Sequence, residues 1–196
     1  MANRNTQGFG LIPQGTIGST PATGGQGKYL IDAGMGVDLF QGTAVRSAAG
    51  YIVTAQAAIT NTCIGVLNGI FYNDATTKKP TFANFYNQPI TPANSEDITA
   101  FVIDNPNQLF VASIDAAAAQ AEYGKTYGLT VTAAGSEISG QSSSELTYAT
   151  RHATNNQWRL VRTAEDPENN DIAAANCSVV VAHNLNQYFT GAVTWQ

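Results

Sequence analysis

Charged residues are scarce in this chain. Only 12% of the residues are Asp, Glu, Lys or Arg, about half of the roughly 25% that is usual in soluble domains. The 9 basic residues are outnumbered by 14 acidic ones, which gives a net charge of −5. Proteins that bind nucleic acid concentrate Lys and Arg on one face, where they displace counterions from the phosphate backbone. This charge balance therefore predicts no nucleic-acid partner.

Cysteine and long apolar runs are scarce as well. Cys63 and Cys177 lie far apart, and neither belongs to a CxxC pair or to a metal-ligand spacing. We expect two buried thiols rather than a disulfide. No run of about 20 apolar residues could cross a membrane, and the N-terminal MANRNTQGFG lacks the apolar core of a secretory signal. These absences predict a protein that is made in the cytoplasm and has no membrane partner.

Catalytic motifs are also missing. Residues 24–28 (GGQGK) resemble a phosphate-binding loop, but Tyr29 stands where Ser or Thr would bind magnesium. Of the two histidines, neither His152 nor His183 has the local setting of a catalytic triad. The acidic segment 166–171 could bind calcium through loop oxygens, but its order does not match an EF-hand, so we expect a solvated turn. We therefore expect no enzyme, and no catalytic, metal or cofactor-binding residue.

Short β-prone runs between turn residues fill most of the chain. The first set includes GTAVR, YIVTA and CIGVLNGIFY, and a second set begins at residue 98 with ITAFVID. This pattern predicts an all-β fold made of small barrel or sandwich modules. One short helix is expected near residues 116–122 (AAAAQAE), where the side chain of Asp115 can cap its first turn.

The composition divides the chain into three parts. Residues 1–28 are rich in glycine and poor in apolar side chains, which predicts an extended N-terminal arm. We expect residues 29–92 to form a barrel-like module with a loop excursion at 73–92, and residues 93–196 to form a second β-rich module. Two alternatives stay open: the arm lies on a partner or folds back on its own domain, and the excursion is a long loop or an edge hairpin whose aromatic residues cap a barrel end.

Residues of two segments, together with one tryptophan, are the candidate partner-binding residues. The segment before Asp32 carries basic residues and no acidic one, so it could dock on an acidic partner. Trp158 lies among three arginines, either as the anchor of a binding patch or as a core residue whose flanking arginines pair with Glu165 and Asp166. The candidates are Arg4, Phe9, Leu11, Ile12 and Pro13 in the arm, Phe82, Phe85 and Tyr86 in the excursion, and Trp158.

Two segments resemble the capsid decoration, or cement, proteins of tailed bacteriophages. They are YLIDAGMGVDLFQGTAVRSAAGYIVTAQAAITNTCIGVLNGIFY (29–72) and DNPNQLFVASIDAAAAQAEYGKTY (104–127). The resemblance implies an all-β structural protein on the exterior of the virion, which binds the major capsid protein and stabilises contacts between its subunits. It also suggests a homo-oligomer. The alternative is a receptor- or glycan-binding β-module of a phage tail or fibre.

Overall fold

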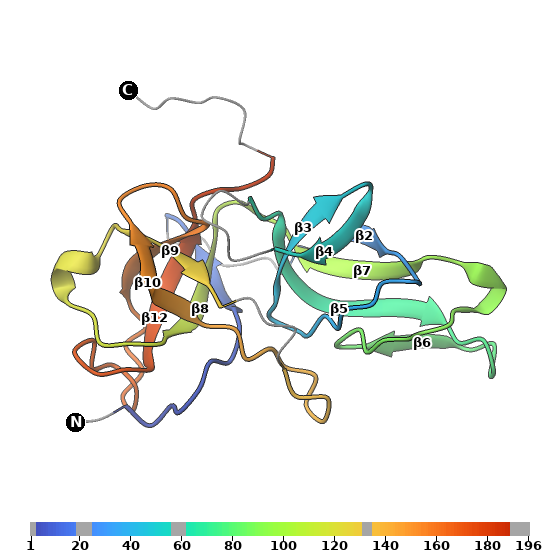
Figure 1. Ribbon diagram of the computed structural model, residues 1–196, viewed down its shortest axis with the longest axis horizontal. Helices are drawn as coiled ribbons and strands as arrows, with labels where there is room; N and C mark the ends of the chain where they lie inside the picture. Colours follow the sequence, from blue (N-terminus) through green and yellow to red (C-terminus); the bar gives the residue numbers. More distant parts are fainter. Residues whose placement is uncertain (1–2, 19–24, 56–61, 131–134, 189–196) are drawn as a thin grey trace.

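The computed structural model describes residues 3–18, 25–55, 62–130 and 135–188, and these residues form β-strands with no α-helix (Figure 1). The all-β class is confirmed. Three-residue 3-10 turns at Ala93–Ser95 and Gln120–Glu122 are the helical segments of the described chain. The strands are β1 Ile12–Thr16, β2 Gly27–Ile31, β3 Ala44–Ala48, β4 Tyr51–Thr54, β5 Gly65–Asn73, β6 Pro80–Ala83, β7 Ile98–Ile103, β8 Gln108–Ile114, β9 Thr126–Leu129, β10 Leu146–His152, β11 Trp158–Thr163 and β12 Cys177–His183.

The first sheet is antiparallel, with strand order β2-β7-β5-β3-β4. The short strand β6 pairs with the C-terminal half of β5, on the same side as β3. The side chains on one face of this sheet form a buried core. Successive side chains along a strand point to opposite faces, so residues between the core positions lie on the other face. The core residues include Ile31, Val45, Ile52, Leu67, Ile70, Ile98 and Val102.

The second sheet closes into a five-stranded barrel. Its strands follow the order β8-β10-β9-β11-β12, and β12 pairs back with β8 to complete the ring. Aromatic rings fill the interior: Phe110 and Trp158 meet edge to face, with ring centroids 5.4 Å apart. Closure removes the free sheet edges that an open sheet would expose.

The N-terminal arm contributes a strand to this barrel. Strand β1 pairs with β8 at Gln108–Val111, on the side of β8 that β10 occupies farther along, at Ile114. Leu11, just before β1, is 1% exposed and belongs to the barrel core. The described part of the arm therefore folds back on its own chain, which is one of the two alternatives left open by the sequence. Residues 1–2 and 19–24 of the expected arm lie outside the described residues.

The two sheets divide the chain later than the boundary expected near residue 93. Strand β7, assigned by the sequence to the second module, pairs with β2 and β5 in the first sheet. The chain crosses to the barrel at the following turn, where the Asn105 side chain accepts a hydrogen bond from the Asn107 backbone N–H (3.0 Å). Composition alone did not show the boundary, because β7 and β8 are equally β-prone.

The prediction of a helix at residues 116–122 was wrong, since only the last three of these residues make a 3-10 turn. The Asp115 carboxylate accepts a hydrogen bond from the backbone N–H of Tyr148 (2.8 Å) instead of capping a helix. The backbone N–H of Ala118 donates to the carbonyl of Ile172 (2.8 Å). A run this short is marginal as a helix, so pairing with neighbouring segments decides its conformation.

The first sheet and the barrel share part of one core. Cys63, Val66 and Ile103 come from the first-sheet half of the chain, yet they pack among the barrel residues. Backbone bonds join the same region: the Cys63 N–H donates to the Leu185 carbonyl (3.1 Å), and the Gln187 N–H donates to the Cys63 carbonyl (2.8 Å). Within the described ranges, no helix is long and apolar enough to span a bilayer.

Candidate binding surfaces

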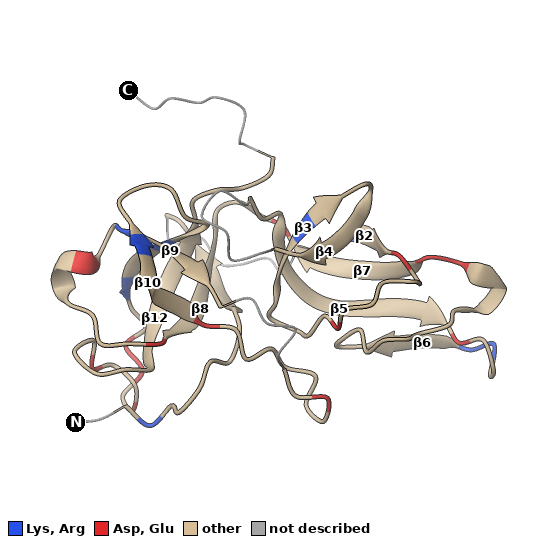
Figure 2. Ribbon diagram, viewed as in Figure 1, with Lys and Arg blue, Asp and Glu red and all other residues tan. Residues whose placement is uncertain are grey.

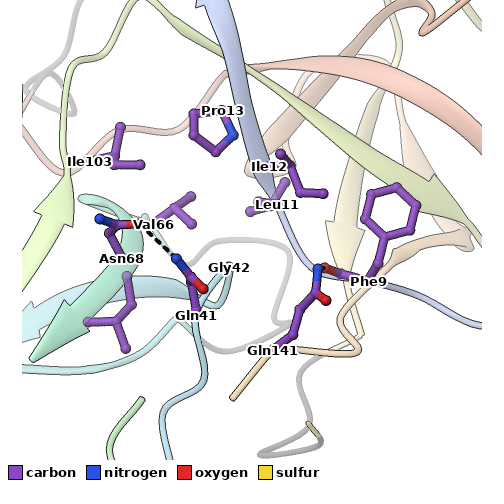
Figure 3. Close-up of a pocket in the computed structure, with 11 residues that line it drawn as sticks. Phe9, Leu11, Ile12, Pro13, Gln41, Gly42, Val66, Asn68, Ile103 and Gln141 are labelled. Atoms are coloured by element: carbon purple, nitrogen blue, oxygen red, sulfur yellow. Dashed lines mark hydrogen bonds between the residues drawn. The ribbon is translucent and has the colours of Figure 1, made fainter. Parts of the chain in front are cut away.

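Four of the arm residues predicted to bind a partner line one side of a cavity. Phe9, Leu11, Ile12 and Pro13 line it from one side, at the start of strand β1 (Figure 3). The cavity has a volume of about 210 Å³. Its other walls are Gln41, Gly42, Val66, Leu67, Asn68, Ile103 and Gln141.

Glycines let the arm approach the first sheet closely at this cavity. Gly10 and Gly42 have φ angles of 78° and 88°, in the left-handed region that favours glycine. The backbone N–H of Leu11 donates to the Gly42 carbonyl (2.9 Å), and the Gly42 N–H donates to the Leu67 carbonyl (2.9 Å). These bonds fix the register of the arm, with Leu11 buried in the core and Ile12 44% exposed.

Amide side chains form the polar part of the cavity. Gln41 Nε2 donates to Asn68 Oδ1 (3.0 Å), and Gln141 Nε2 donates to the Phe9 carbonyl (3.1 Å). Figure 3 shows the Gln41–Asn68 pair on one side of the cavity and Gln141 beside Phe9 on the other. None of the described residues that line the cavity is charged.

Arg4 lies away from the cavity and pairs with Glu168 on the surface. Both side chains are more than half exposed, and exposed pairs of this kind contribute little to stability. Nearby, the Asn3 side chain donates to the carbonyls of Asp171 and Ala175 (both 2.9 Å). Arg4 therefore helps to hold the start of the arm against the chain's own acidic loop.

That acidic loop is internally hydrogen bonded. The Asn169 side chain (2.8 Å) and the Glu168 backbone N–H (3.1 Å) donate to the Asp166 carboxylate and, with Ser178, lower its pKa. Asp171 accepts from the Ala173 backbone N–H (3.0 Å). No group of three or more His, Cys, Asp or Glu side chains in the described chain is placed to hold a metal ion.

The excursion at 73–92 begins as an edge hairpin of β5 and β6, and its three aromatic residues have different environments. Tyr86 is fully buried, its hydroxyl donates to the Met35 carbonyl (2.9 Å), and burial raises its pKa. Phe85 stacks on Phe40 with ring centroids 5.4 Å apart. Phe82 is 62% exposed. Of the three, Phe82 has the most surface to offer a partner, whereas Tyr86 is a core residue.

Phe82 belongs to an apolar surface on the outside of the first sheet. The strand register aligns Phe82 of β6 with Phe71 of β5, and then with Thr99 of β7 and Leu30 of β2. The ring of Phe82 also contacts Phe101 (5.9 Å between centroids). Phe71 is 37% exposed and Leu30 is 42% exposed. We call Leu30, Phe71, Phe82 and Phe101 the outer aromatic face.

The outer aromatic face is almost free of charge. Strands β5, β6 and β7 contain no Asp, Glu, Lys or Arg, and Figure 2 shows charged residues of this sheet in the turns at the strand ends and on β3. The charged residue beside the face is Lys28 of β2, which is opposite Phe101 in the strand register. Gly69 lies beneath Phe82, since a Cβ there would be 2.7 Å from the end of the ring. The missing side chain lets Phe82 lie across the sheet and reach Phe101.

The sequence analysis named Phe82 as a candidate but did not name the other three residues of this face. A register shift between Leu67 and Gly69 turns Leu67 and Ile70 to the same core. A prediction that assumes strict alternation along the whole of β5 therefore puts Leu67 and Ile70 on opposite faces, although they share one core. The glycine at position 69 was the available signal, because a glycine inside a strand often marks such a bulge.

Trp158 is fully buried in the barrel, so it has no surface with which to touch a partner. Its ring packs against His183, with centroids 4.4 Å apart. Arg159 donates to the Asn184 side chain (2.6 Å), and Arg162 lies 3.8 Å from the carboxylate of Glu165. The structure therefore has the core tryptophan with flanking arginines, which was the alternative to a binding patch.

Cys63 and His183 form the closest approach to a catalytic pair in the described chain. The Cys63 sulfur lies 3.4 Å from His183 Nδ1. Burial raises the pKa of the Cys63 thiol to about 12 and lowers the pKa of His183 to about 4. Both groups are therefore neutral at pH 7, whereas a nucleophilic cysteine needs a lowered pKa. Cys63 and Cys177 are free and buried, as the sequence predicted.

Comparison with known proteins adds no relative. No protein-family model matches the chain, and neither a curated protein nor a solved structure matches it.

Proposed function

We propose that this chain is a structural protein of a tailed-phage virion, which binds the outside of the capsid through its outer aromatic face. The observation that carries the proposal is the exposed row of Phe82, Phe71 and Leu30 across a sheet, with Phe101 beside it. Contiguous apolar patches on a protein surface mark sites of interaction with other proteins.

The outer aromatic face has the physical character of an interface centre. Its side chains project from paired strands, so little conformational freedom is lost on binding. Buried aromatic residues at the centre of an interface supply most of the binding free energy, and the surrounding polar residues exclude water. A stable contact buries about 800 Å² on each partner. The neutral surface around the face would then supply most of the contact area.

The partner in this proposal is the major capsid protein. The resemblance of segments 29–72 and 104–127 to decoration proteins supports this choice, and so does the shortage of charge, because an uncharged surface suits protein contact better than nucleic acid. Self-association into a small oligomer would let several weak contacts act together on the symmetric capsid lattice, and this avidity would strengthen the overall binding. The role is structural and not enzymatic.

Binding to undecorated heads of the cognate phage tests the proposal. The variant Phe82→Ser removes the most exposed ring of the face, and Val161→Ser removes a 40% exposed apolar side chain on β11 of the barrel as the matched control. We expect Phe82→Ser to weaken head binding at least tenfold, as hot-spot truncations do, with little change in unfolding. Equal binding by Phe82→Ser, Val161→Ser and the unchanged protein would reject the assigned face.

A further inference from the structure

The cavity beneath the arm has the size and the lining of a small-ligand site. Pockets for drug-sized ligands measure about 300–1,000 Å³, whereas this cavity measures about 210 Å³. It therefore suits a ligand of a single ring. Its mouth is open to solvent, because Ile12, Pro13 and Gln141 are exposed.

The side-chain amides of the cavity have further hydrogen-bond donors and acceptors to offer a ligand. Gln41 and Asn68 use one N–H and one oxygen on each other. Within the described chain, no hydrogen bond occupies the Asn68 amide N–H groups or the Gln41 side-chain oxygen. A hydroxyl both donates and accepts a hydrogen bond, so neighbouring hydroxyls match an amide donor beside an amide acceptor. The oxygen of Gln141 supplies a further acceptor at the opposite wall, next to Phe9.

The apolar lining residues and the absence of charged ones among the described lining limit which kinds of ligand the cavity could bind. Among the apolar lining residues, Ile12 and Pro13 are exposed and offer a surface for C–H groups, whereas Val66 and Ile103 are buried. A purely apolar ligand would take water from the side-chain amides of the cavity without replacing its hydrogen bonds, and unsatisfied amide groups disfavour binding. A charged ligand would meet no opposite charge among the described lining residues.

We propose that this cavity binds one neutral sugar ring, with its hydroxyls on the amides of Gln41, Asn68 and Gln141 and its C–H groups against the exposed apolar lining residues. This activity is separate from capsid binding, since the cavity contains none of the outer aromatic face. Failure of either proposal leaves the other standing.

Titration of the ¹⁵N-labelled full-length protein with sugars tests this proposal. The probes are methyl glycosides of glucose, galactose, mannose and N-acetylglucosamine, which imitate the end of a saccharide chain. We expect one or more of them to shift the side-chain amide signals of Gln41, Asn68 and Gln141 saturably, with a Kd on the order of 1 mM. No saturable shift with any glycoside would overturn the proposal, as would tighter binding of cyclohexane-1-methanol, a mainly apolar ring of similar size.

Two variants remove the amides while keeping the side-chain length. Asn68→Leu and Gln41→Met should each weaken glycoside binding at least tenfold, and a ¹H–¹⁵N spectrum shows whether each variant is folded. The control is Asn170→Leu, which removes an exposed amide outside the cavity. Unchanged glycoside affinity in a folded Asn68→Leu or Gln41→Met variant would overturn the assignment of the site.

Discussion

His183 shows how burial at a single residue makes stability depend on pH. Its ring lies between Trp158, Phe110 and the thiol of Cys63, and its Nε2 is buried without a hydrogen-bond partner in the described structure. Burial lowers its pKa from 6.5 to about 4. Protonation is therefore easier in the unfolded chain than in the folded one.

Stability is expected to fall as the pH drops from 6.5 to about 4, because the unfolded state binds a proton on His183 that the folded state does not. The contribution is complete above pH 6.5 and amounts to about 3 kcal/mol, at about 1.4 kcal/mol per pH unit. Urea unfolding across this range checks it. His183→Phe keeps a ring against Trp158 and should flatten the pH dependence by that amount, whereas His152→Gln, at an exposed position, should not. Identical pH profiles for His183→Phe and the unchanged protein would contradict the account.

Gly65 marks the closest backbone approach at the start of β5. A Cβ at this position would lie 2.9 Å from Asp104 Cα and would also collide with the Ile103 carbonyl. We predict that Gly65→Ala lowers the free energy of unfolding by about 1–3 kcal/mol, because backbone atoms would have to move. Gly15 offers the control, since no atom lies within 4 Å of its added Cβ. A loss of stability in Gly15→Ala as large as that in Gly65→Ala would contradict this reading.

At the scale of elements, strand β1 makes the arm part of the barrel. Leu11 is 1% exposed and packs in the barrel core. We predict that Leu11→Ala lowers the free energy of unfolding by about 2–5 kcal/mol, as for other large-to-small core changes. Ile17→Ala, at a side chain that is 55% exposed, should change it by no more than about 0.5 kcal/mol. Denaturant midpoints measure both, and a stable Leu11→Ala variant would show that the arm is dispensable for the fold.

The kind of element was predictable from the sequence, but its partners were not. Apolar alternation and turn residues identified most strands, since these are local signals. The pairing of β1 with β8 and of β7 with β2 is long-range, and nothing near Ile12 or Ile98 encodes it. For the same reason the sequence did not show that the boundary between the sheets follows β7.

The sequence indicated which types of residue could form a binding surface, but it did not indicate which of them are exposed. Phe9, Leu11, Ile12 and Pro13, named together as partner-binding candidates, line one cavity, because neighbours in an extended segment stay close. Phe82, Tyr86 and Trp158 are all aromatic, yet only Phe82 is exposed. Exposure depends on which strands cover a side chain, so Phe71 and Leu30 could be added only once the sheet was known.

At the scale of the whole molecule, the two sheets should unfold together. Val66 and Ile103 of the first sheet pack in the barrel core, and Asn186 after β12 donates to the Ile64 carbonyl (3.4 Å). We predict a single calorimetric transition whose van't Hoff and calorimetric enthalpies agree. Two separate transitions would contradict the shared core.

The proposed role requires the outer aromatic face to be covered in the assembled virion. A cryo-electron microscopy reconstruction of heads saturated with the purified protein tests this most directly. We predict density for the protein at many equivalent lattice positions, with Phe71, Phe82 and Phe101 against the major capsid protein. Heads without added density, or a bound protein whose Phe82 faces solvent, would contradict the account.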